Sequence, residues 1–247
     1  MNNHVQSPRV AIVTGAAQGL GRSIAARLFQ DGFNIAINDI PEKSKQLEEI
    51  AREIEGDSRK AGRVLVALAD VSVESEVKAS TETLDRVLAV NVRGTFLCYK
   101  YASEQMIRQG GGGRIIGASS LAGKRGKVFV LDVVNRVAES KGLINIGQGM
   151  LSAYSASKFA IRGLTQAAAV ELGKHGITVN AYAPGAIVTE MFHSMSDQMK
   201  NGLAARASLG CHGTTDDIAN FVSYIVSDQA KFITGQSVTI DGGIHFD

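Results

Sequence analysis

The chain has 247 residues, of which 45% are hydrophobic and 20% charged, a composition typical of a folded domain with a substantial buried core. Its 26 basic and 24 acidic residues give a formal net charge of +2, which argues against nucleic acid or an anionic membrane as a partner. Two cysteines are too few for a disulfide framework, and we find neither a secretory leader nor an apolar run long enough to cross a bilayer. We therefore expect a cytosolic protein.

Strand and helix patterns alternate along the chain. Apolar β-rich runs predict strands, and apolar residues at helical spacing predict helices between them. The predicted strands are 9–13, 34–38, 63–67, the run after the glycines of 110–120, 178–182 and 237–240, and the predicted helices are the one from Leu20, then 42–55, 84–108, 153–174 and 216–227. This alternation predicts one α/β domain over residues 1–247, with a Rossmann-like, doubly wound parallel sheet.

The segment from Thr14 to Gly21, TGAAQGLG, follows the first predicted strand and opens the first predicted helix. Glycines in this position let the backbone approach a pyrophosphate, whose charge then lies at the positive end of the helix. An ordinary glycine-rich turn would have the same composition. Asp39 favours the dinucleotide site, because it ends the second strand 24 residues after Gly15, near the spacing expected for a carboxylate that binds the adenosine ribose.

A carboxylate at Asp39 would repel the 2′-phosphate of NADP by roughly 4 kcal/mol per unit charge at about 4 Å and an effective dielectric of about 20. The sequence therefore favours NAD(H) over NADP(H). Lys43 and Lys45 lie close by in the sequence and would weaken this preference. In the alternative interpretation, Asp39 is a solvated loop residue.

Tyr154 and Lys158 stand four residues apart in YSASK, so on a helix they share one face. An ammonium near a phenol can lower the pKa of the phenol, which has a reference value near 10. Tyr154 would then exchange a proton with a carbonyl or alcohol oxygen. Without the glycine loop, the same residues would indicate only an exposed pair on a helix.

Taken together, TGAAQGLG, Asp39, AD at Ala69, VNVRG at Val90, ASS at Ala118, YSASK at Tyr154 and APGAIVT at Ala183 resemble the short-chain dehydrogenase/reductase family over nearly the whole chain. The resemblance implies an NAD(P)-dependent oxidoreductase with four catalytic residues. Tyr154 is then the general acid-base, Lys158 lowers its pKa and holds the ribose, Ser120 binds the substrate carbonyl, and Asn91 supports a proton-relay water. Of the two adjacent serines, Ser119 would orient Ser120.

The same resemblance implies a cofactor site, in which Asp70 and Val71 contact the adenine and Thr189 contacts the nicotinamide carboxamide. The full implied set is Gly15, Gln18, Gly19, Leu20, Gly21, Asp39, Asp70, Val71, Asn91, Tyr154, Lys158, Pro184, Gly185, Ile187 and Thr189. The stretch from YSASK to TEMF and the ending DGGIHF are similar to the acetoin/diacetyl reductase and butanediol dehydrogenase branch. That likeness implies a small ketone or diketone substrate, or its alcohol, and the family implies a homo-oligomer, commonly a tetramer.

Two stretches depart from the family pattern. Its Asn-Asn-Ala-Gly motif is missing and only 21 residues separate Asp70 from Asn91, fewer than the roughly 30 of a strand-helix-strand unit. We therefore expect one central strand-helix unit to be missing. Ser120 and Tyr154, by contrast, are 34 residues apart, which indicates an insertion at about 127–149.

The insertion has two interpretations. One is an active-site lid, since long loops inside compact domains often cover sites. The other, which we favour, is a retained intron, because removal of Val128–Gln148 restores a family-like SSLAGKRGKGMLSAYSASK. Valine codons begin with GT and glutamine can be encoded by CAG, as the boundaries of an intron require.

The altered stretches leave alternatives to an active enzyme. A non-catalytic nucleotide-binding or interaction protein would keep the glycine loop, and a mis-spliced chain would fail to fold stably. Metal catalysis is not expected, because the five histidines are scattered without ligand spacing.

Overall fold

The computed structural model describes residues 9–56, 63–68, 82–124, 148–193 and 195–246. The chain divides into two compact units, which are considered separately. Unit 1 comprises 1–70, 188–196 and 214–224, and unit 2 comprises 71–187, 197–213 and 225–247. A single domain over residues 1–247 therefore stays a prediction.

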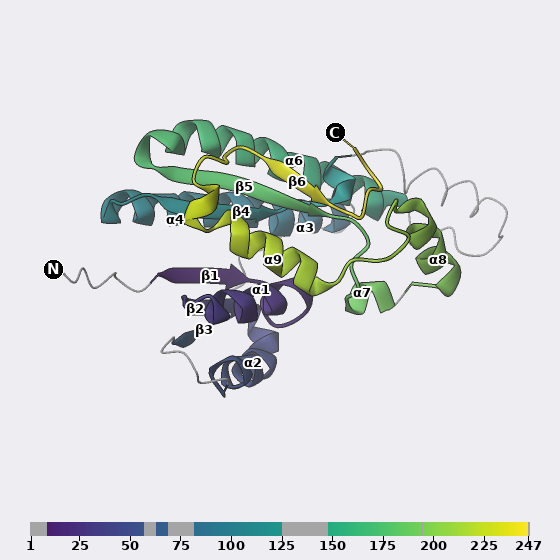
Figure 1. The fold of residues 1–247 in the computed structure, drawn as a ribbon, viewed down its shortest axis with the longest axis horizontal. Coiled ribbons are helices and arrows are strands. Elements are labelled where there is room, and N and C mark those ends of the chain that lie inside the picture. The colour runs from purple at the N-terminus through teal and green to yellow at the C-terminus, as the bar shows by residue number, and fades with distance from the viewer. Residues whose placement is uncertain (1–8, 57–62, 69–81, 125–147, 194, 247) are drawn as a thin grey trace. The chain divides into compact units, whose positions relative to one another are not determined.

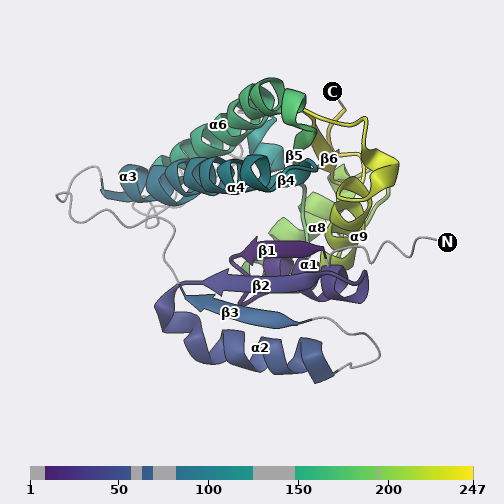
Figure 2. The same cartoon turned by 90° about the vertical axis from the view of Figure 1, so that its left-hand side faces the viewer.

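Unit 1 is built on three parallel strands in the order β1-β2-β3 (Figure 2). Helices α1 and α2 pack against this sheet, and their apolar stripes supply Leu28, Leu47 and Ile50 to its core beside Ile35 and Ile37 of β2. The bounds are β1 Val10–Thr14, α1 Gly19–Gln30, β2 Asn34–Asp39, η1 Pro41–Lys43, α2 Ser44–Gly56, β3 Val64–Leu68, α7 Glu190–His193 and α9 Thr215–Ile225. The predicted strand-turn-helix around the glycine loop is confirmed.

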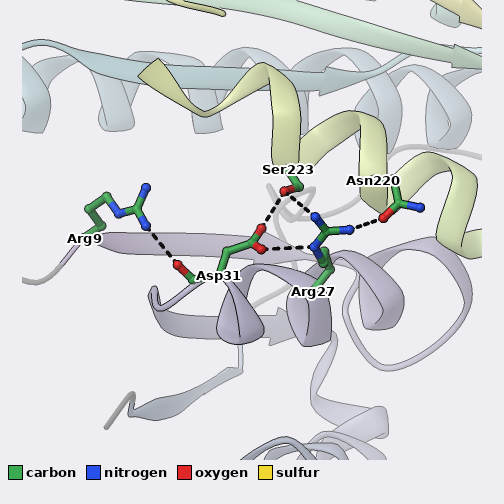
Figure 3. Close-up of polar contacts among 5 residues, drawn as sticks. All are labelled: Arg9, Arg27, Asp31, Asn220 and Ser223. Atoms are coloured by element: carbon green, nitrogen blue, oxygen red, sulfur yellow. Dashed lines mark hydrogen bonds and ion pairs between the residues drawn. The ribbon is translucent and has the colours of Figure 1, made fainter. Parts of the chain in front are cut away.

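Polar side chains attach α9 to the C-terminal end of α1 (Figure 3). The guanidinium of Arg27 pairs with Asp31 at 3.1 Å and donates to Asn220 and, at 3.0 Å, to Ser223. Ser223 in turn donates to the second carboxylate oxygen of Asp31 at 2.6 Å, and Arg9 donates to the Asp31 carbonyl at 2.9 Å. This network, named here the Arg27 cluster, joins the late segment 214–224 to the first helix of the chain.

Unit 2 is built on three further parallel strands, in the order β4-β5-β6. Helices α4 and α6 lie together against this sheet (Figure 1) and enclose a core of Tyr99, Ile115, Ala169, Ile177 and Val179. The bounds are α3 Glu82–Leu88, η2 Ala89–Gly94, α4 Thr95–Gln109, β4 Gly113–Ala118, η3 Leu121–Gly123, α6 Gln148–Leu172, η4 Gly173–His175, β5 Ile177–Pro184, α8 Asp197–Arg206, η5 Asp228–Ala230 and β6 Ser237–Ile240.

The helix predicted over 84–108 is not continuous. It is interrupted by η2, one turn of π-helix that contains Asn91. Such turns insert one extra residue into a helix and are frequent at functional sites.

The two sheets have edges where a central strand is expected. Within the described part of the chain, β1 pairs with β2 alone and β4 pairs with β5 alone. Loss of the strand-helix unit between Asp70 and Asn91 predicts these two edges. The insertion at 127–149 lies almost entirely outside the described residues.

Candidate active site

The glycine loop in unit 1 has a backbone that side chains would disrupt. Gly15 and Gly19 have φ angles of 64° and 55°, in the left-handed region that favours glycine. A Cβ on Gly21 would lie 2.2 Å from the Gly15 carbonyl oxygen. Helix α1 starts at Gly19, and its N-cap residue Gln18 makes no side-chain capping bond. The first N–H groups of α1 are therefore available to an anion such as a pyrophosphate.

Asp39 lies against this loop, as its position at the end of β2 predicts. One carboxylate oxygen accepts a hydrogen bond from the Ala17 amide at 3.0 Å, and the other accepts one from the Ile40 amide at 2.9 Å. A carboxylate has about four acceptor positions, so ribose hydroxyls can still bind. The ammonium of Lys43 donates to the side-chain oxygen of Gln18, which places a positive charge beside the same loop.

Thr189 also belongs to unit 1, and its methyl group lies 3.9 Å from the Cβ position of Gly19. Pro184, Gly185 and Ile187, by contrast, belong to unit 2. There β5 ends at Pro184, and the Gly185 amide donates to the Ile240 carbonyl at 3.0 Å. Asp70 and Val71, the expected adenine contacts, lie outside the described residues.

The four expected catalytic residues all belong to unit 2. Ser120, at the start of η3, forms a side-chain hydrogen bond with Tyr154 near the start of α6. The ammonium of Lys158 donates to the Ala118 carbonyl at 2.9 Å and lies 5.5 Å from the centre of the Tyr154 ring. The Ser119 hydroxyl donates to the Lys158 carbonyl at 3.0 Å. Ser119 therefore fixes the backbone of Lys158, whereas we expected it to orient Ser120.

One electrostatic expectation is wrong for this structure. Burial raises the pKa of Tyr154 above its ordinary value, and only the hydrogen bond from Ser120 opposes this rise. The ammonium of Lys158 is directed at the Ala118 carbonyl, and its charge does not outweigh the effect of burial on Tyr154. Burial also lowers the pKa of Lys158 itself to about 8. At neutral pH the phenol is therefore protonated, which is the form that a general acid needs.

Asn91 is held by groups that sequence analysis did not single out. Its side-chain amide donates to the Ser157 hydroxyl at 2.9 Å, and its backbone carbonyl accepts from the Thr95 hydroxyl at 2.7 Å. The Ser157 hydroxyl donates to the Tyr154 carbonyl at 2.7 Å. Ser157 lies inside the YSASK motif, so its place near Tyr154 and Lys158 could have been recognised from that motif. The contact with Asn91, 66 residues earlier, has no signal in the sequence.

Family models match most of the chain. The short chain dehydrogenase model matches residues 9–84 and 75–131, and the model described as enoyl-(acyl carrier protein) reductase matches residues 140–245. The chain is 40% identical to a short-chain dehydrogenase/reductase of Armillaria gallica, with 98% of each protein covered. It is 34% identical to a 3-oxoacyl-[acyl-carrier-protein] reductase of Staphylococcus aureus, with 95% of the chain and 97% of the relative covered.

The chain belongs to the short-chain dehydrogenase/reductase family. It is accordingly an NAD(P)-dependent oxidoreductase with the Rossmann-like fold. A solved family structure from Burkholderia cenocepacia, in complex with NADP, has a TM-score of 0.77 and 27% identity, with 98% of this chain and 99% of that one covered. No helix in the described part of this chain is long and apolar enough to span a membrane.

The comparisons also support the missing unit. The alignment with the Armillaria protein extends over 280 positions, more than the 247 residues of this chain, so the relative has residues that this chain lacks. The short chain dehydrogenase model matches in two stretches, which overlap at residues 75–84, between Asp70 and Asn91.

Proposed function

We propose that this enzyme uses NAD(H) to interconvert a small ketone or vicinal diketone, such as diacetyl or acetoin, and the corresponding alcohol. The observation that carries the reaction type is the Ser120–Tyr154 hydrogen bond beside Lys158. It brings two hydroxyl groups together, and both can donate to one carbonyl oxygen. The small substrate is supported by the likeness of the segment from YSASK to TEMF, and of the ending DGGIHF, to acetoin and diacetyl reductases.

The side chains of the protein bind the carbonyl oxygen of the substrate and supply the proton that it receives. A bound reduced nicotinamide would supply the hydride to the carbonyl carbon. As negative charge develops on the oxygen, the Ser120 hydroxyl stabilises it and the Tyr154 phenol protonates it, which leaves a phenolate. The Lys158 ammonium lies over the ring and stabilises that phenolate by its charge. In the oxidative direction, the phenolate removes the proton from the alcohol.

The loop of unit 1 fits the pyrophosphate of the cofactor. Its backbone turns so tightly that a Cβ at Gly21 would lie 2.2 Å from the Gly15 carbonyl oxygen, and the first turn of α1 has no side-chain cap. We propose NAD(H) as the preferred cofactor, because Asp39 presents its carboxylate beside this loop. Lys43 lies over the same loop and reduces the preference. In the Asp39→Ser variant, the ratio of kcat/KM for NADPH to that for NADH should rise at least tenfold, and an unchanged ratio would exclude this role.

A 3-oxoacyl thioester is the second candidate substrate. It is favoured by the 34% identity to the Staphylococcus aureus 3-oxoacyl-[acyl-carrier-protein] reductase over 95% of the chain. The chemistry at the carbonyl is the same, so only the binding of the rest of the substrate differs. NADH oxidation with diacetyl, acetoin and an acetoacetyl thioester separates the two candidates. A kcat/KM higher for the thioester than for both small substrates would overturn the small-substrate proposal.

We also propose that the enzyme is a homo-oligomer, a tetramer by family resemblance. Large apolar side chains are exposed on α4 and α6, the two helices that cover the sheet of unit 2. Phe96 and Ile107 on α4, and Phe159 and Val170 on α6, are each 11 residues apart, about three helical turns, so each pair shares a face. Light scattering of the parent and of Val170→Glu tests this, and a monomeric parent would contradict it.

A cytosolic location fits this activity. Cys98 and Cys211 are both free thiols, which is compatible with a reducing compartment. Fractionation of the producing cells, with immunodetection of the chain, tests this location.

A further inference from the structure

Three hydrogen bonds connect α4, Asn91 and the catalytic tyrosine. The Thr95 hydroxyl donates to the Asn91 carbonyl at 2.7 Å, the Asn91 side-chain amide donates to the Ser157 hydroxyl at 2.9 Å, and the Ser157 hydroxyl donates to the Tyr154 carbonyl at 2.7 Å. All four residues belong to unit 2. The Ser157 hydroxyl accepts one of these bonds and donates another, so these two bonds polarise and strengthen one another.

Ser157 is the residue that joins Asn91 to Tyr154, because its hydroxyl takes part in both hydrogen bonds. Its side chain is fully buried, so water does not reach the Ser157 hydroxyl itself. A hydroxyl can accept one hydrogen bond and donate another at the same time. Alanine at this position would leave both the Asn91 amide and the Tyr154 carbonyl without this partner.

The π-turn η2 explains why Asn91 reaches α6. It widens the helix between α3 and α4 at the position of Asn91. Ser157 then ties this turn to the backbone of Tyr154, three residues earlier in α6. The phenol oxygen is the far end of the same residue, so its place beside Ser120 depends on that backbone.

We propose that Ser157 is a positioning residue, which couples Asn91 to Tyr154 and so holds the phenol beside Ser120 for proton transfer. This inference rests on the proposed function. It adds a role to Asn91, which by resemblance supports a relay water. In this chain Asn91 acts on Tyr154 through the Ser157 hydroxyl.

The first test is kinetic and uses Ser157→Ala, with Ser155→Ala as the matched control on the same helix. Ser157→Ala should lower kcat about tenfold with little change in KM for NADH, as expected when one hydrogen bond that orients a catalytic group is lost. Ser155→Ala should keep the parent kcat. Asn91→Ala combined with Ser157→Ala should be no slower than Asn91→Ala alone, because both act through one contact. Parent kcat in Ser157→Ala, or losses that multiply, would overturn the proposal.

Ser157→Thr keeps the hydroxyl and separates positioning from stability. Its extra methyl group in a filled site should lower the melting temperature, while kcat stays within about threefold of the parent, less than the loss expected from one hydrogen bond. A kcat that falls in step with melting temperature across the variants would show a structural role only. If Ser157→Ala does not fold, a tenfold loss in a folded Ser157→Thr overturns the proposal.

A titration without substrate distinguishes this inference from the proposed function. The phenolate absorbance of the parent minus that of Tyr154→Phe reports the ionisation of Tyr154. In the parent, the hydrogen bond from Ser120 lowers the pKa of Tyr154. Loss of positioning in Ser157→Ala should weaken this hydrogen bond. The pKa of Tyr154 should therefore rise in Ser157→Ala. An unchanged titration contradicts the inference about Ser157, whereas a parent without turnover on any carbonyl contradicts the proposed function alone.

Discussion

At the scale of single residues, the catalytic cluster combines a protonated acid with a cation that is costly to bury. Burial raises the pKa of Tyr154 and lowers that of Lys158 to about 8. Both shifts disfavour the charged forms, as expected where water is excluded. The cluster therefore starts in the protonation state that reduction of a carbonyl requires. Its pH dependence follows from Lys158, whose charge is lost as the pH rises through about 8.

Lys158 makes the stability of the enzyme depend on pH. Its pKa is lower in the folded chain than in the unfolded chain, so the unfolded state binds more protons between about pH 8 and 10.5. The cost of burying the ammonium is complete below about pH 8 and is lost as the pH rises toward 10.5. The free energy of unfolding of Lys158→Met minus that of the parent should fall over this range, by at most ~1.4 kcal/mol per pH unit. Urea unfolding at several pH values measures it, and a constant or rising difference would contradict the assignment.

Gly21 is the residue on which the cofactor loop depends most directly. A methyl group there would lie 2.2 Å from the Gly15 oxygen and 2.7 Å from its carbonyl carbon, and neither backbone atom can move without reshaping the loop. Gly21→Ala should weaken NADH binding at least tenfold, a loss of about 1.4 kcal/mol or more, as measured by nucleotide fluorescence. Gly56→Ala is the control, since its added methyl meets nothing within 4 Å. Parent affinity in Gly21→Ala would show that the loop does not bind the cofactor.

At the scale of elements, the Arg27 cluster attaches α9 to α1 and makes a late segment part of unit 1. Thr189 belongs to the same unit and lies beside Gly19. Side chains about 190 residues apart in sequence therefore hold α9 against the C-terminal end of α1.

Arg27→Ala should lower the free energy of unfolding by about 1–3 kcal/mol, because it leaves Asp31 and Ser223 with fewer partners in a half-buried site. Arg22→Ala on the same helix is the control. Arg22 pairs with Glu53 in an exposed position, and such a pair contributes about 0–1 kcal/mol. Chemical denaturation measures both variants. Equal effects of the two substitutions would show that the cluster does not attach α9.

Elements with a clear apolar pattern could be predicted from the sequence. The strand at 237–240 has the predicted bounds, and the strand-loop-helix around Gly15 is confirmed. Helix α8, Asp197–Arg206, was not predicted, since it has no apolar face and none of its described residues is buried. The π-turn at Asn91 was not predicted either, because the apolar residues on each side of the turn keep helical spacing.

The catalytic residues could be proposed because YSASK and ASS are local motifs, and the structure brings Ser120 and Tyr154 into contact. The contact between Asn91 and Ser157 depends on how α6 packs on η2, which residue spacing does not encode. The pKa direction of Tyr154 was wrong because the sequence indicates which charges are near one another, but not how much water burial removes.

At the scale of the whole molecule, the chain is a family member whose described strands form two three-stranded sheets. Within the described residues, β1-β2-β3 form one sheet and β4-β5-β6 form the other, and β1 and β4 each pair with a single strand. The proposed loss of a strand-helix unit between Asp70 and Asn91 would account for both edges, and the segment at 127–149 is the second departure from the family pattern. Deletion of Val128–Gln148 should raise the melting temperature and keep or raise kcat, if that segment is a retained intron. Loss of activity on deletion would favour a lid.

The most direct test of the central claim is NADH oxidation with diacetyl by the chain and by its Tyr154→Phe variant. We predict turnover by the chain, and a loss of at least 100-fold in kcat for Tyr154→Phe, as expected when a general acid is removed, while the variant still binds NADH. A chain that folds and binds NADH but turns over neither small ketones nor the thioester would contradict the account. It would then be a non-catalytic nucleotide-binding protein.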